Sequence, residues 1–177
     1  ALAHAGIPFE VVPGVPSPLA ATTYAGISLT HRDLASSVAF ITATESPEKD
    51  TSSHDWAHLA TATQTLVIFM GRRRLASMMQ ALMDHGRSPE TPVAVVQWAS
   101  LPRQRTVVGT VANIHARVVE AGIGTPALTI VGEVVKLRET LRWFDIKPLF
   151  GRRVLVTRAL DQAGALVTKL REAGADT

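Results

Sequence analysis

The sequence predicts an α/β protein, because short apolar strand-like runs alternate with helical segments along its 177 residues. An almost continuous apolar run at residues 65–70 is typical of a strand buried on both faces of a sheet. Directly after it, apolar residues recur at helical spacing until Gly86. Hydrophobic residues make up 46% of the chain and charged residues 19%, a balance that favours a folded core over disorder.

The N-terminal part predicts a strand, a helix and a second strand. A short strand is expected at residues 9–12, where Pro13 and Gly14 stop it. A helix of small residues is expected from about Pro18 to Ala25, closed by Gly26. The second strand is expected at residues 37–42.

The middle of the chain contains the clearest helix. A polar, proline-containing loop at residues 45–53 and a short helix at 55–61 precede the buried strand at 65–70. The helix that follows carries an apolar stripe at i, i+3, i+4, i+7 and i+8, formed by Leu75, Met78, Met79, Leu82 and Met83. Methionines also form soft ligand surfaces, but this helical spacing favours ordinary core.

The last part of the chain predicts two units. Strands are expected at residues 91–97, 105–111 and 126–131, and helices at 114–121 and 134–144. Residues 145–150 contain Pro148 and lack periodicity, which predicts a domain boundary. A strand at 152–157 and a helix at 160–170 then form one βα unit of a second α/β domain.

The positive charge is confined to the C-terminal end. Residues 1–146 hold twelve Lys and Arg against twelve Asp and Glu, so the net charge of +3 comes from residues 147–177. Aromatic residues make up 5% of the chain, which offers no basic and aromatic platform for nucleic acid. A nucleic-acid partner is therefore not expected. A membrane partner is not expected either, because no apolar run reaches the length of a membrane span.

A metal site is not expected. The chain has no cysteine, which excludes a thiolate site and fits a cytoplasmic protein. His54 and His58 lie four apart on a short helix, but no third ligand stands nearby. A solvated helix face is therefore the favoured interpretation of this pair.

Three polar segments remain as candidate binding sites. Arg72, Arg73 and Arg74 follow the buried strand and are interpreted as a solvated helix start, with an anion clamp as the alternative. Residues 12–17 leave a strand and enter a helix, where α/β proteins place ligands. Residues 30–33 gather four polar groups after a turn. On physical grounds alone, the two loops are as well explained by ordinary loop polarity.

Several segments together resemble the uroporphyrinogen-III C-methyltransferases of the tetrapyrrole methylase family. The resemblance covers residues 1–146 and is carried by the segments at 6–15, 24–33, 65–71, 92–96, 104–110 and 126–135. The most specific combination is Leu-Thr-His-Arg at 29–32 with the Pro-Ala-Leu strand that begins at Pro126. Residues 147–177 are similar, over a shorter stretch, to the start of uroporphyrinogen-III synthase.

The resemblance implies a fold and a division of the chain. The expected fold is the back half of a two-subdomain methylase followed by the βα unit of a truncated synthase. Residues 1–42 end the first subdomain, 43–64 connect, 65–146 form the second subdomain, and 147–177 hold the linker and synthase start. The family's Gly-Pro-Gly-Asp loop and Gly-Gly-Asp segment are expected upstream of Ala1, so the isolated chain is expected to be inactive.

The resemblance also implies an activity, which is methylation of uroporphyrinogen III to precorrin-2 by S-adenosylmethionine. The product would serve sirohaem or cobalamin synthesis, and the enzyme is expected to be a cytoplasmic homodimer. The residues expected to contact the cofactor are Pro16, Ser17, Met70, Ala99 and Ala127.

The substrate side is expected to include His31 and Arg32, since the Arg32 guanidinium suits a propionate carboxylate. Pro16 departs from the family pattern, which has Thr or Ser there, and proline offers neither a hydroxyl nor an N–H group. Catalytic residues are not assigned. The rival interpretation is a non-catalytic α/β module that serves dimerisation.

Overall fold

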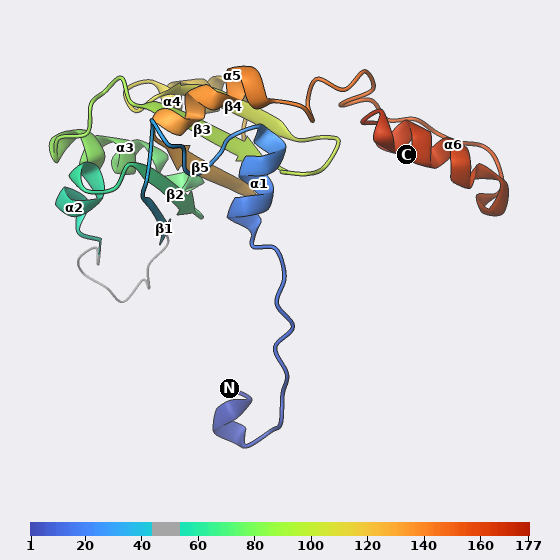
Figure 1. The fold of residues 1–177 in the computed structure, drawn as a ribbon, viewed down its shortest axis with the longest axis horizontal. Coiled ribbons are helices and arrows are strands. Elements are labelled where there is room, and N and C mark those ends of the chain that lie inside the picture. Colours follow the sequence, from blue (N-terminus) through green and yellow to red (C-terminus); the bar gives the residue numbers. More distant parts are fainter. Residues whose placement is uncertain (44–53) are drawn as a thin grey trace.

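A five-stranded mixed sheet forms the centre of the computed structural model, which describes residues 1–43 and 54–177 (Figure 1). The strand order is β1-β2-β5-β3-β4; β1 and β2 pair in parallel, and the other three pairs are antiparallel. The strands are β1 (Val38–Thr42), β2 (Thr65–Phe69), β3 (Pro92–Gln97), β4 (Arg105–Thr110) and β5 (Ala127–Val131). These five predicted strands are confirmed. The predicted loop at 45–53 lies outside the described residues.

Alternate residues of the central strands face two separate cores. In β2, Leu66 and Ile68 enter one core, whereas Val67 enters the other. β3 repeats the pattern, with Val93 in the first core and Ala94 in the second. Because successive strand side chains point to opposite faces, a continuous apolar run is what a strand covered on both sides requires.

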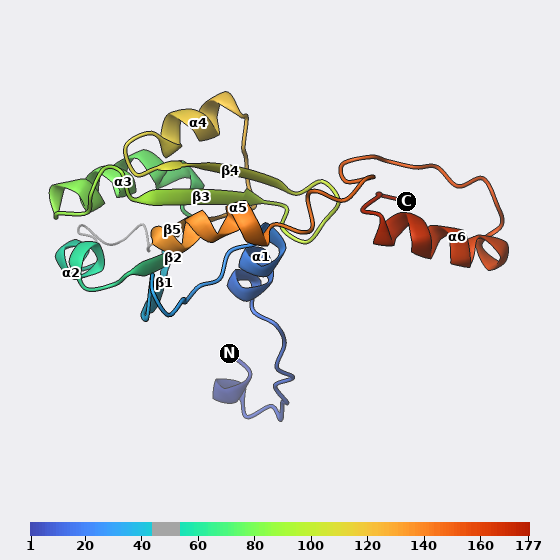
Figure 2. The same cartoon turned by 45° about the horizontal axis from the view of Figure 1, so that its top comes forward.

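Helices cover both faces of the sheet (Figure 2). The first face is covered by α2 (Trp56–Thr61), α3 (Leu75–Asp84) and α4 (Ile114–Glu120). The second is covered by α1 (Ser17–Ala25) and the 3-10 helix η3 (Glu133–Leu137). Short 3-10 helices also lie at η1 (Ala3–Ala5) and η2 (Arg72–Arg74). The stripe on α3 is core, as predicted: four of its residues are buried and Met83 is half-buried.

The C-terminal end of α1 depends on a glycine. Gly26 adopts φ +69, and the amide of Ile27 donates to the carbonyl of Thr22 at 2.8 Å, which closes the last turn. A Cβ atom at Gly26 would lie 2.5 Å from the backbone nitrogen of Arg142. Both the backbone conformation and the close approach therefore require glycine here.

Two predicted strands are wrong. Residues 7–16 form no regular element, and Phe9 and Val12 are 56% and 87% exposed. In the segment 152–157, only Arg153 forms a bridge, to Asp176. A strand needs a hydrogen-bonded neighbour along its length, and neither segment has one among the described residues.

The predicted helix at 134–144 is also shorter than expected. It consists of η3 followed by α5 (Arg138–Leu141), and it ends because Arg142 turns to an extended conformation at φ −63, ψ 129. Phe144 is still buried, but it reaches Tyr24 from a non-helical segment, with the two ring centroids 4.7 Å apart.

The predicted C-terminal helix is confirmed as α6 (Leu160–Glu172), which lies apart from the sheet in both views (Figures 1 and 2). Its segment is tied to the preceding turn, where the amide of Leu149 donates to the carbonyl of Ala173 at 2.9 Å. The division into domains remains a prediction. No helix within the described ranges has the length and apolar character that crossing a membrane requires.

Candidate functional site

A pocket of about 570 Å³ opens at one edge of the sheet, beside α1. β2 and β3 both end at this edge, and β5 begins there because it runs antiparallel to both. Ligand sites in α/β proteins commonly lie beyond the carboxyl ends of strands, and small-molecule sites have volumes of roughly 300–1,000 Å³. The lining residues are Ser17, Ala21, Phe69, Met70, Arg72, Arg73, Val96, Trp98, Ala99, Leu101, Thr125, Pro126, Ala127 and Leu128.

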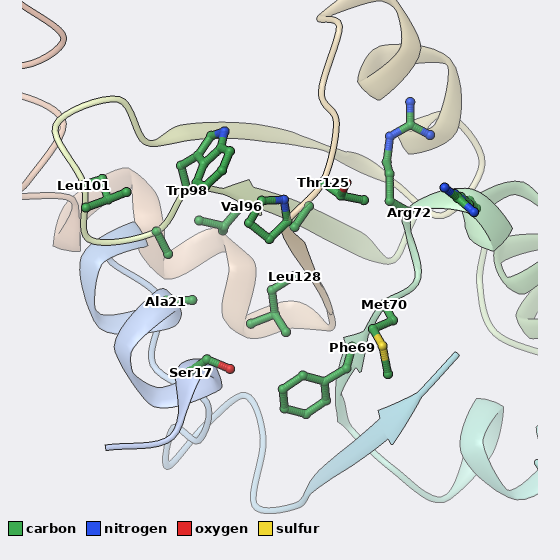
Figure 3. Close-up of a pocket in the computed structure, with 14 residues that line it drawn as sticks. Ser17, Ala21, Phe69, Met70, Arg72, Val96, Trp98, Leu101, Thr125 and Leu128 are labelled. Atoms are coloured by element: carbon green, nitrogen blue, oxygen red, sulfur yellow. The ribbon is translucent and has the colours of Figure 1, made fainter. Parts of the chain in front are cut away.

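The residues that line the pocket are mostly apolar, and several of their side chains are small (Figure 3). Ala21 on α1, Ala99 after β3 and Ala127 at the start of β5 leave room where larger side chains would fill the space. Among the described lining residues, the ionisable ones are Arg72 and Arg73, and none is a carboxylate. The pocket can therefore bind and orient a ligand, but it presents no acid–base pair.

The backbone around the pocket adopts strained conformations. Met70 and Trp98 have φ +52, and Ser100 has φ +68; within the described ranges these are the non-glycine residues with positive φ. Each such residue costs of order 1 kcal/mol or more and persists where surrounding contacts impose it, often at ligand sites. All three lie just beyond β2 or β3, beside or within the pocket wall.

A comparison with known families agrees with this arrangement. The family model for Tetrapyrrole (Corrin/Porphyrin) Methylases matches residues 1–115. The chain belongs to the tetrapyrrole methylase family. Because the match covers α1 and the strands β1 to β4, it includes three sides of the pocket.

Relatives of this methylase chain include longer proteins. The chain is 46% identical over 176 residues to a uroporphyrinogen-III C-methyltransferase of Bacillus subtilis, covering 99% of the chain and 36% of that protein. It is 48% identical over 143 residues to a sirohaem synthase of Chromobacterium violaceum, covering 81% of the chain and 30% of that protein. The chain thus spans about a third of the length of these relatives.

A solved structure supports the fold. The uroporphyrin-III C-methyl transferase of Thermus thermophilus, complexed with S-adenyl homocysteine, superposes with a TM-score of 0.62 at 35% identity. The alignment covers 77% of this chain and 57% of that chain. The mixed α/β architecture of the methylase is therefore confirmed.

Four of the five residues predicted to contact a cofactor line the same pocket. Ser17 begins α1, Met70 follows β2, Ala99 follows β3 and Ala127 begins β5. Pro16 is not among the lining residues; its carbonyl caps α1 by accepting from the amides of Leu19 and Ala20. The role of all five residues in cofactor binding remains a prediction.

The two residues predicted to face the substrate lie outside the pocket lining. His31 and Ala35 exchange backbone hydrogen bonds of 2.8 and 3.0 Å across a tight turn. The Nδ1 atom of His31 accepts from the amide of Asp33 at 3.2 Å, and the Arg32 side chain is exposed. The turn therefore orders the His31 ring and leaves the Arg32 guanidinium accessible.

The three arginines at 72–74 fit neither interpretation fully, because they form neither a fully solvated helix start nor a complete anion clamp. The Nε atom of Arg72 donates to the carbonyl of Ile123 at 2.6 Å, and Nη1 of Arg74 donates to the carbonyl of Ala43 at 3.5 Å. Figure 3 shows the Arg72 side chain extending away from Phe69 and Met70. Two of the three guanidinium groups thus bind backbone carbonyls, and Arg73 at the pocket wall is exposed.

The histidine pair has structural contacts. The Nε2 atom of His54 lies 3.0 Å from the carbonyl of Thr42, and the amide of His58 donates to the Asp55 carboxylate at 3.0 Å. Asp55 is thereby the N-cap of α2. Within residues 1–43 and 54–177, no group of three His, Cys, Asp or Glu side chains is placed to hold a metal.

Sequence reasoning missed several pocket residues, above all Trp98 and Leu101 in the loop after β3. An aromatic residue directly after a buried strand is a signal that points to Trp98. The conformation of the loop, in which the Arg103 guanidinium lies 4.1 Å from the Trp98 ring centroid, has no local sequence signature.

Proposed function

We propose that this chain is part of a uroporphyrinogen-III C-methyltransferase, which uses S-adenosylmethionine to methylate two ring carbons of uroporphyrinogen III and yields precorrin-2. The observation that carries the proposal is the pocket beside α1. The resemblance to the methylase family implies that Ser17, Met70, Ala99 and Ala127 contact the cofactor, and they line one pocket although they are far apart in the sequence. The names of the Bacillus and Thermus relatives supply the substrate class.

The described side of the pocket fits S-adenosylmethionine. Its volume suits a nucleoside-sized ligand, and alanine walls allow the ligand to approach the main chain closely. Positive φ at Met70 and Trp98 reorients peptide groups at the ends of β2 and β3, where backbone N–H and carbonyl groups can bind a ligand. We assign Ser17, Met70, Ala99 and Ala127 to holding the cofactor, together with Pro16, which directly precedes Ser17.

The bound cofactor would supply an electrophilic methyl group on its sulfonium centre. The chain then has to hold the two reactants in line and keep them from moving, and effects of this kind supply much of the acceleration in group-transfer reactions. This division of labour agrees with a pocket whose described lining contains no carboxylate. We assign His31 and Arg32 to the substrate side, with Arg32 binding a propionate through two parallel hydrogen bonds.

The C-terminal segment is assigned to a second activity. We propose that residues 147–177 begin a uroporphyrinogen-III synthase domain, as the resemblance of residues 151–158 suggests, and that the parent enzyme is a cytoplasmic homodimer. Support for a separate unit comes from the position of α6 away from the sheet. Translation of the adjoining coding sequence tests this assignment, because a synthase domain requires several further βα units.

The substitution Ala99→Trp tests the cofactor site. In a chain extended upstream to the length of its relatives, we expect S-adenosylhomocysteine to bind, and we expect Ala99→Trp to abolish binding by filling the pocket. Isothermal calorimetry measures binding, and circular dichroism checks that the fold is unchanged. The matched control is Ala116→Trp, which adds the same side chain at an exposed position of α4.

The outcomes separate the alternatives. The 177-residue chain alone is expected to bind weakly or not at all, since affinity requires both sides of the cleft. Tight binding by that chain would refute the need for an upstream half, and unaltered binding by the Ala99→Trp variant would remove Ala99 from the site. An extended chain that dimerises but neither binds the cofactor nor transfers methyl groups would support the non-catalytic module.

A further inference from the structure

We propose that Gln104 is a positioning residue that holds two walls of the pocket in register. The inference rests on the proposed function, because the ligand concerned is the cofactor of that reaction. Gln104 begins no element and does not line the pocket, yet its side chain is buried, with 3% of the residue exposed. A buried amide away from any ligand has to be explained by its own contacts.

The side-chain amide of Gln104 joins the loop after β3 to helix α1. Its Oε1 atom accepts from the backbone amide of Ser100 at 2.9 Å, within the loop of residues 98–104. Its Nε2 atom donates to the carbonyl of Tyr24 at 3.2 Å, in the last turn of α1. One side chain thus fixes the distance between segments that are 80 residues apart in sequence.

Both of these segments form the pocket. The loop contributes Trp98, Ala99 and Leu101, and α1 contributes Ser17 and Ala21. A change in their separation would alter the width of the pocket. Since binding and group transfer depend on geometry at the level of about 1 Å, the amide controls the site without touching the ligand.

The loop requires such an anchor because its backbone is strained. Trp98 and Ser100 both have positive φ, which is unfavourable for residues other than glycine. The Ser100 amide that Gln104 binds belongs to one of these two residues. Within the loop, the backbone adds hydrogen bonds from Leu101 to Trp98 at 3.2 Å and from Gln104 to Leu101 at 2.8 Å. The side-chain contact to Ser100 therefore stabilises the conformation that presents the pocket wall.

Gln104→Met is the informative variant, because methionine has a similar volume and replaces the amide by a thioether that accepts hydrogen bonds only weakly. In the 177-residue chain, we expect the Ser100 amide to exchange with solvent at least tenfold faster and the Trp98 indole NMR signal to shift. The Trp56 indole signal should stay unchanged. Gln104→Asn keeps an amide but is one methylene shorter, so it cannot span both contacts and should act in the same direction. It also serves if the methionine variant does not fold.

In the extended chain, we expect Gln104→Met to raise the Kd for S-adenosylhomocysteine and the KM for S-adenosylmethionine at least tenfold, with kcat changed less than threefold. Gln80→Met on the exposed face of α3 is the matched control and should change none of these quantities. A residue with only a structural role would lower the melting temperature and leave Kd and KM unaltered.

The result that overturns the inference is an unchanged Ser100 exchange rate, or an unchanged Kd and KM in folded variants. If the proposed function is wrong, the result is different, because the unsubstituted extended chain would then not bind S-adenosylhomocysteine. In that case the role of Gln104 in shaping a cofactor site is overturned with it, even if the exchange and indole measurements show that Gln104 holds the loop.

Discussion

Met79 and Leu82 on α3 lie in the core beneath the sheet, with 2% and 0% of each residue exposed. We expect Met79→Asp to destabilise the protein by several kcal/mol, because it buries a charge without a partner. Leu82→Ala should cost roughly 2–5 kcal/mol through lost burial and the cavity that it leaves. Urea denaturation measures both. Ala76→Asp, on the exposed face of the same helix, should change stability little. Unchanged midpoints for the two core variants would contradict the assignment of this face to the core.

For single residues, the sequence predicts which side chains are buried better than it predicts which ones line the pocket. The spacing of Met79 and Leu82 reports a helical face directly, since periodicity is a local property of the chain. Trp98 and Leu101 enter the pocket because the loop that carries them is fixed by a hydrogen bond from Gln104 to distant Tyr24. No short-range pattern encodes a contact of that kind. Ala99 was found only through the resemblance to a family.

At the scale of elements, predictions held where a segment has a neighbour. The run at 65–70 forms β2, because β1 and β5 pair with its two edges. The segment at 9–12 has a comparable apolar pattern, but it lies in an exposed, irregular stretch. Strand propensity shows only that a segment can form a strand. Whether the strand forms depends on hydrogen-bonded partners supplied by the rest of the fold.

Helix α1 allows a prediction about its N-terminal end. Its N-cap is Pro16, which makes no side-chain hydrogen bond to the first turn. A threonine there could accept from the amide of Leu19, which now donates to the Pro16 carbonyl at 3.1 Å. We expect Pro16→Thr to be more stable than Pro16→Ala by roughly 1 kcal/mol, the usual contribution of such a cap. Comparing these two variants cancels the effect of removing proline from the unfolded chain. Equal urea midpoints would mean that the end of α1 needs no cap.

At the scale of the whole molecule, the net charge changes at the predicted domain boundary. Residues 1–146, which include the sheet and its helices, carry no net charge, and the excess of +3 lies in residues 147–177 with α6. A backbone contact between the two parts involves the pocket loop, where the amide of Gly151 donates to the carbonyl of Pro102 at 3.0 Å. A C-terminal domain attached here would therefore sit next to the proposed cofactor site.

Limited proteolysis tests whether these two parts are separable units. Trypsin should cut first at Arg152, Arg153 or Arg158, because all three are exposed in a stretch without regular structure. Lys147 also lies at the predicted boundary, but we do not expect an early cut there, because it is half-buried and precedes Pro148, and trypsin cleaves Lys–Pro bonds poorly. Mass spectrometry of the first fragments identifies the cuts. The large fragment should keep its circular dichroism spectrum, since the sheet and both cores lie within it. Early cuts inside residues 65–135 would instead show that the boundary is misplaced and that the protein opens at its sheet.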